Sequence, residues 1–171
     1  MKKTVFTLML IFVSAMFLNA QSITGKQWWT GVIADDGSEV YIGLSFEKDS
    51  SCTLILTADY EIKEDDVPIT LTGTVGLPGT YTLKDKDLKL KMSKADAEVD
   101  LDYDIKGMDA KTKELMDKQI KDGINGLKNE FKNEMLQGLS KLIHWKVVSV
   151  ESKQLIMKLV ETGDDLTFVT E

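Results

Sequence analysis

The chain has 171 residues and a formal net charge of −7, with 28 acidic residues against 21 basic ones. All the basic residues are lysines, so the forked, bidentate recognition of phosphate that arginine provides is absent. Binding to nucleic acid needs a basic face, and we therefore expect no nucleic-acid partner. Cys52 is the single cysteine, which excludes an intrachain disulfide.

The first 20 residues have the pattern of a signal peptide. Two lysines precede an apolar run from Val5 to Leu18, which is short for a membrane span. Cleavage after Ala20 leaves Gln21 first, whereas a bacterial lipoprotein would need a cysteine there. We expect a periplasmic or secreted bacterial protein without a membrane anchor. Its mature chain would keep 19 lysines against 28 acids, a net charge of −9.

Residues 21–171 suit one domain, and their alternation of apolar and polar side chains predicts that it is mainly β. From Trp28 to Ile105, short alternating segments are separated by the turn-forming stretches DDGS, KDSS, KEDD, GLPG and DKD. Three further strand-like segments, HWKVVSV, QLIMKLVE and DLTFVT, end the chain. We predict an antiparallel up-and-down barrel of about 8–10 strands, because closure removes exposed strand edges.

Residues 109–143 break this alternation. Their apolar residues recur at steps of three and four, which predicts an amphipathic helix before the last three strands. Asp109 is a suitable N-cap, while Gly123 and Gly126 weaken the middle and leave open a break into two helices. The helix either docks on its own barrel, as a lid or side brace, or binds a protein partner or a second copy. The apolar stripe comprises Met116, Ile120, Ile124, Leu127, Phe131, Met135, Leu139 and Leu142.

Residues suited to catalysis are scarce, and we expect a protein that is not an enzyme and has no cofactor. Cys52 falls on the apolar face of its segment, where a thiol is normally inert. His144, the single histidine, stands beside Trp145 at the helix-to-strand junction, a place typical of a boundary role. A zinc site would need carboxylates at a spacing that the sequence lacks. Of three function classes, a ligand-binding protein, a protein-interaction module and an enzyme such as a carboxylate-based hydrolase, the enzyme has the least support.

One acidic row is regular. Its members alternate along one segment and therefore share a face. A cation patch is one interpretation, since hard cations take several oxygen ligands. A solvated outer face is the favoured one, with Lys89 and Lys91 of the preceding segment as cross-strand partners. The row comprises Glu98, Asp100, Asp102 and Asp104.

Four segments carry a resemblance to a known family. A glycine precedes a tryptophan between Gly25 and Trp28, and LSFEKDSSCTL, GTYTLKDKDLKLKM and HWKVVSVESKQLIMKL follow. Together they resemble the lipocalin-like, calycin-type barrels of small secreted bacterial proteins, which are mostly of unknown function. In such barrels the tryptophan plugs one end and stacks on a late arginine. Here the resemblance implies Trp28 as the plug, with Lys158 or Lys146 in place of the arginine.

The resemblance implies binding of a small hydrophobic ligand inside the barrel. The alternative is a protein-interaction or inhibitor-type module with a solid core. Because adjacent strand residues face opposite ways, Trp29 should lie on the outer face, where the helix stripe would cover it. The residues expected to line the barrel and touch a ligand are Val40, Ile42, Leu44, Leu54, Leu56, Tyr60, Leu71, Tyr81, Leu90 and Tyr103.

Overall fold

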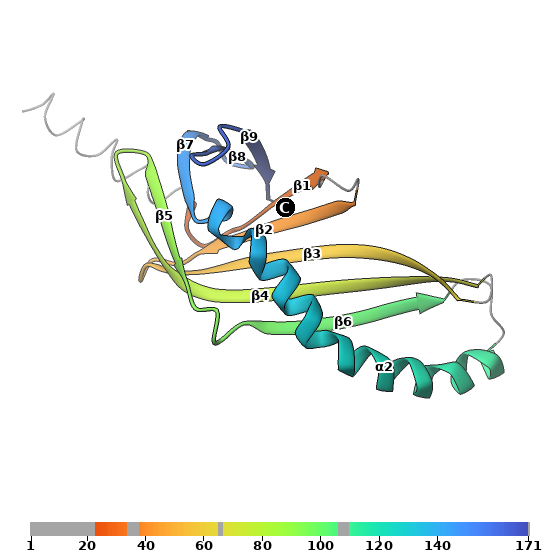
Figure 1. Ribbon diagram of the computed structural model, residues 1–171. Helices are drawn as coiled ribbons and strands as arrows, with labels where there is room; N and C mark the ends of the chain where they lie inside the picture. Colours follow the sequence, from red (N-terminus) through yellow and green to blue (C-terminus); the bar gives the residue numbers. More distant parts are fainter. Residues whose placement is uncertain (1–22, 34–37, 65–66, 106–109, 171) are drawn as a thin grey trace, which may run out of the picture.

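The computed structural model describes residues 23–33, 38–64, 67–105 and 110–170 (Figure 1). The expected signal peptide and the expected N-cap Asp109 lie outside these residues. The elements are, in chain order, β1 (Gln27–Ile33), β2 (Glu39–Phe46), β3 (Ser51–Glu64), β4 (Val67–Lys84), β5 (Asp87–Met92), β6 (Glu98–Ile105), α2 (Ala110–Gln137), the 3-10 helix η1 (Gly138–Leu142), β7 (His144–Val150), β8 (Gln154–Leu159) and β9 (Asp165–Val169).

Eight of the strands close into an antiparallel barrel, as the alternation predicts. Neighbours follow the order β1, β2, β3, β4, β5, β7, β8 and β9, and the pairing of Trp29 with Val169 closes the circle. Strand β6 pairs with β4 alone and lies outside this circle. The barrel and the single helix before the last three strands are compatible with a calycin-type fold.

Strand β4 corrects one prediction. GLPG, residues 76–79, is not a turn, because β3 pairs with β4 without interruption from Ser51 opposite Thr80 to Glu64 opposite Val67. The other edge of β4 changes partner here, since β6 pairs with it up to Gly76 and β5 from Gly79 onward. Pro78, which has no N–H to give a ladder, sits in the short gap between the two partners.

Because β5 and β6 follow one another along the same edge of β4, they do not lie side by side. Lys89 and Lys91 on β5 therefore do not face the acidic row on β6, as the sequence suggested. The register places Lys89 opposite Thr82 on β4 and His144 on β7. On β6 the cross-strand neighbours are threonines and a glycine: Thr70, Thr72, Thr74 and Gly76.

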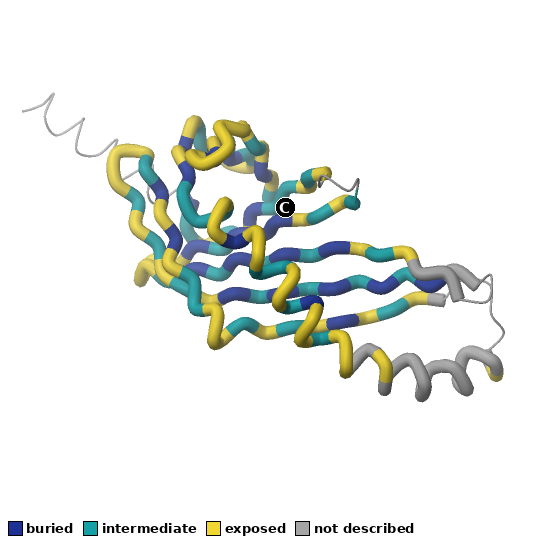
Figure 2. The backbone as a smooth tube through the Cα atoms, viewed as in Figure 1, coloured by how far each residue is buried: buried dark blue, intermediate teal, exposed yellow. Residues whose placement is uncertain are grey.

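The inner face of the barrel is apolar, and none of the buried residues in the described ranges is polar or charged. Figure 2 shows buried positions alternating with partly exposed ones along β3 and β4. Burying a large apolar side chain is worth roughly 1.5–3 kcal/mol. The alternation thus supplies the main stabilising term as well as the register.

Helix α2 runs across the inward side of β3, β4 and β6 (Figure 1). It continues through Gly123 and Gly126 and gives way to η1 only at Gly138. The cost of about 1 kcal/mol for each helical glycine is evidently outweighed by burial of Phe131 and Leu139, which continues the predicted stripe. Side chains of Met116, Ile120 and Ile124 lie outside the described part.

Candidate functional site: the inward face beneath helix α2

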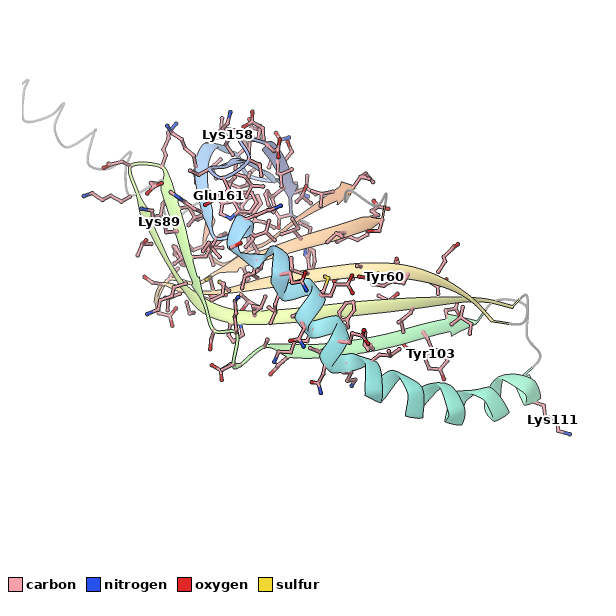
Figure 3. All side chains as sticks on the ribbon, viewed as in Figure 1. Tyr60, Lys89, Tyr103, Lys111, Lys158 and Glu161 are labelled. Atoms are coloured by element: carbon pink, nitrogen blue, oxygen red, sulfur yellow. The ribbon has the colours of Figure 1, made fainter. Side chains whose placement is uncertain are left out.

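Two cross-strand rows of inward side chains lie beneath α2. In the first, Leu71 on β4 stands between Tyr60 on β3 and Tyr103 on β6. Figure 3 shows both tyrosines on the part of the sheet that the helix crosses. In the next row, Gly73 stands between Ala58 and Leu101. We call Ala58, Tyr60, Leu71, Gly73, Leu101 and Tyr103 the helix-covered end of the barrel.

The second row contains two small residues, Ala58 and Gly73, and a side chain of α2 fills the space above them. A Cβ built on Gly73 would lie 2.1, 2.4 and 2.7 Å from Cζ, Cε2 and Cε1 of Phe131. The two Cε atoms are only slightly farther than Cζ, so the tip of the ring lies with its face over the glycine. Phe131 also meets Tyr60 edge to face, with ring centroids 5.9 Å apart. A methyl group on residue 73 would therefore displace this ring.

Most residues expected to line a ligand site are core residues. Val40 pairs with Ala58 and is half-buried at the helix-covered end. Tyr60 and Tyr103 are partly buried against the core. The others among the ten, apart from Tyr81, are at most 8% exposed: Ile42, Leu44, Leu54, Leu56, Leu71 and Leu90. The structure thus brings Tyr60, Leu71 and Tyr103 together beneath α2, and Val40 lies on β2 beside Ala58.

Trp28 lies toward the opposite end, level with Leu54 on β3, which the rise of a strand places about 13 Å from Ala58 and about 20 Å from Tyr60. Its ring is completely buried, and its Nε1 donates a hydrogen bond to the carbonyl of Ile23 at 2.9 Å. The cation over its ring is Lys26, with Nζ 5.2 Å from the centroid. Neither Lys158 nor Lys146 takes that place. They stand opposite one another in the register of β8 and β7, and both side chains are exposed on the outward side.

The remaining residues around Trp28 make this end compact. Ile23, Phe46 and Cys52 are at most 4% exposed. Tyr81 packs edge to face on Phe46 at 5.1 Å, and its hydroxyl donates to the carbonyl of Glu47 at 3.0 Å. Tyr81 therefore belongs here, far from Tyr60 and Tyr103. We call Ile23, Trp28, Phe46, Cys52 and Tyr81 the sealed end.

The thiol and the imidazole lie on opposite faces of the barrel. Cys52 points inward, and desolvation raises the pKa of its thiol to about 11. His144 points outward, because its neighbour Trp145 is fully buried. Its Nε2 lies 2.6 Å from Oδ1 of Asp87, and this hydrogen bond is the main reason that the pKa of Asp87 is lowered. A Cys–His pair is excluded, and His144 joins β7 to β5.

The acidic row of β6 is fully outward. Glu98, Asp100, Asp102 and Asp104 are exposed. In the part of the chain that the structure describes, no group of three or more histidine, cysteine or acidic residues is placed to hold a metal ion. Of this row, Asp102 accepts a hydrogen bond from the backbone N–H of Tyr103 at 2.8 Å.

Sequence reasoning missed the contact between Phe131 and Gly73. Phe131 was recognised only as one member of a stripe, and Gly73 only as part of a strand. A glycine inside a strand often marks the close approach of another group, and this was the available signal.

No protein-family model matches the chain, and a search of curated proteins finds no match. Within the described ranges, none of the helices has the length and apolar character needed to cross a membrane.

Proposed function

We propose that this is an exported, non-enzymatic, lipocalin-like protein that binds a small apolar molecule at the helix-covered end of its barrel. One observation carries the proposal, namely the Phe131 ring over Gly73. Here the inner surface is completed by a side chain from outside the sheet. A small apolar ligand would take the place of that ring, and α2 would act as the lid.

The composition of the interior supports an apolar ligand. Every buried side-chain nitrogen or oxygen in the described part has a hydrogen-bond partner, so no such group is left for a polar molecule to satisfy. Apolar pockets with a few polar tips at the rim are typical of small-molecule sites. Tyr60 and Tyr103 have such polar tips, which suit a ligand with one polar group at its edge.

Native mass spectrometry of the protein purified from its own host tests the proposal directly. We expect a co-purifying small molecule, and binding of the neutral fluorophore N-phenyl-1-naphthylamine by the delipidated protein. Failure to bind the fluorophore more tightly than a denatured control would refute the proposal.

Two glycine variants of β4 locate the site. Gly73→Val should weaken fluorophore binding about tenfold or more, equivalent to about 1.4 kcal/mol, because a side chain would fill the space beneath α2. Gly76→Val is the matched control, since nothing lies within 4 Å of a Cβ there. Circular dichroism should show both variants folded. Equal binding by the two variants would place the ligand elsewhere.

A protein-interaction module is the second candidate function. Leu127, one turn before Phe131, belongs to the apolar stripe of α2 and is 41% exposed, so the barrel leaves this part of the stripe uncovered. In that case Leu127→Ser would abolish capture of a protein partner while leaving fluorophore binding unchanged.

A further inference from the structure

Trp29 lies flat on the outside of the barrel. A Cβ on Gly43, its cross-strand partner on β2, would lie 2.6, 2.7 and 2.9 Å from three consecutive carbons of the indole, Cζ3, Cη2 and Cε3. An edge-on ring would leave the third carbon much farther away than the first two, so the face of the indole covers Gly43. Since α2 lies on the inward side, it does not cover this ring, which corrects the expectation from the sequence.

A second aromatic ring lies beside a second glycine. Gly31 on β1 faces Tyr41 on β2, and the Tyr41 ring is in van der Waals contact with a Cβ built there, at 3.4 and 3.6 Å. Trp29 and Tyr41 are thus diagonal neighbours across β1 and β2, a separation of about 7–8 Å that aromatic side chains span. Tyr41 is 39% exposed. The two rings form a shallow aromatic surface.

The described charged side chains on the outward face of β1, β2 and β3 are of one sign. On the outward positions of β1, β2 and β3 whose side chains are described, the ionisable groups besides Tyr41 are the carboxylates of Glu39, Asp59 and Glu61. Glu39 lies next to Tyr41, and its hydrogen bond is the main cause of a raised pKa for the tyrosine hydroxyl. Anionic ligands are disfavoured here, whereas ligands rich in hydroxyl donors suit such acceptors.

We propose that Trp29 and Tyr41 form a stacking platform for the pyranose rings of a neutral glycan. The apolar C–H face of one sugar would lie on the face of the indole turned away from Gly43, and the next sugar would lie on Tyr41, where its hydroxyls would donate to Glu39 and Asp59, the carboxylates beside that ring. The two rings lie side by side over β1 and β2 rather than around one point, an arrangement that matches successive flat sugar faces better than a single ammonium group. This platform is on the opposite side of the sheet from the site beneath α2 and is independent of it.

Affinity electrophoresis in gels containing barley β-glucan, galactomannan or xylan tests the platform. We expect at least one of these neutral polysaccharides to retard the parent protein, and the Trp29→Ala and Tyr41→Ala variants to lose the retardation. Val148→Ala is the matched control, since Val148 is an exposed apolar residue on β7. It should migrate as the parent does. Urea unfolding curves identify any variant that has lost its fold, and Tyr41→Ala remains informative if Trp29→Ala unfolds.

Three results would overturn the inference. Absence of retardation by all three polysaccharides is one, and equal retardation of the parent and a folded Tyr41→Ala variant is another. The third is binding of an oligolysine peptide that requires Trp29, with no binding to cello-, manno- or xylo-oligosaccharides by calorimetry. That outcome would make the surface a site for cations.

Discussion

The two ends of the barrel are built from the same alternating strands, yet they are filled in different ways. At the sealed end the large side chains come from the strands and from the segment that precedes β1, with Trp28 and Phe46 fully buried. At the helix-covered end the strands also contribute large side chains, but one row contains the small Ala58 and Gly73, and the missing volume there comes from Phe131 on α2.

This difference means that the two ends of the barrel differ in how easily their interior can be opened. Side chains on paired strands cannot leave the core without breaking a ladder of hydrogen bonds. A ring on a helix can leave if the helix moves, and local openings of this kind cost less than global unfolding. Under the proposed function, the helix-covered end is therefore where a ligand would enter, whereas the sealed end holds the fold together.

The largest expected effect is at Trp28. Trp28→Ala should lower the free energy of unfolding by about 3–5 kcal/mol, because it leaves a cavity in the core. Trp29→Ala should cost roughly 1 kcal/mol, as expected for a partly exposed outer residue. Urea denaturation measures both. If Trp29→Ala proved the more damaging, the assignment of the inward and outward faces would be wrong.

Gly73→Ala sharpens the comparison at the other end. The added methyl group collides with the Phe131 ring, and overpacking of this kind typically costs about 1–3 kcal/mol. We expect α2 to lose protection against amide hydrogen exchange while the strands of the sealed end keep theirs. Gly76→Ala, with open space around its Cβ, should leave the protection of α2 unchanged.

Cys52 reports on the sealed end through pH. The pKa of its thiol is raised from 9.0 to about 11 in the folded protein. Between these pH values the thiol is therefore ionised in the unfolded chain and neutral in the folded one. Stability contributed by this group is complete below pH 9 and falls as pH rises toward 11. A Cys52→Ala variant should lose that part of the decline. Rapid alkylation of the native thiol at pH 8 would show that this end is open.

The smallest effect on stability is expected at the contact between Asp87 on β5 and His144 at the start of β7. The pKa of Asp87 is lowered chiefly by its hydrogen bond to His144, so this carboxylate contributes stability above its ordinary pKa that is lost as pH falls. Asp87→Asn should lower the melting temperature slightly at pH 6 and by less at pH 3. An equal change at both values would mean that the carboxylate charge is not involved.

The fold followed from local patterns. Alternation marked the strands of the barrel, and the three- and four-residue spacing marked α2, because each pattern reports directly on which face is buried. The opposite faces of Trp28 and Trp29 followed from the same rule. The patterns did not predict the point at which the edge of β4 changes its partner strand from β6 to β5. GLPG contains three typical turn residues, two glycines and a proline, yet pairing with β3 along its whole length keeps it extended.

The candidate site was predicted only in part. Tyr60, Leu71 and Tyr103 were expected to face inward, and they do so as one row. The closeness of Phe131 to Gly73 depends on how α2 crosses the sheet, and the spacing of apolar residues gives no crossing angle. Lys26 over Trp28 was missed for a similar reason, since its position depends on the path of the chain before β1.

The pairing of Trp29 with Val169 sets the order in which this barrel can be completed. Strand β1 can complete its pairing only when β9, near the end of the chain, is available. Joining segments so distant in sequence is slow because of the entropy of loop closure. Until β9 has been synthesised, the two edges remain unpaired and the apolar inner face stays open to other chains. The protein is thus most vulnerable to aggregation before β9 has paired with β1, and truncation before residue 165 would make that vulnerability permanent.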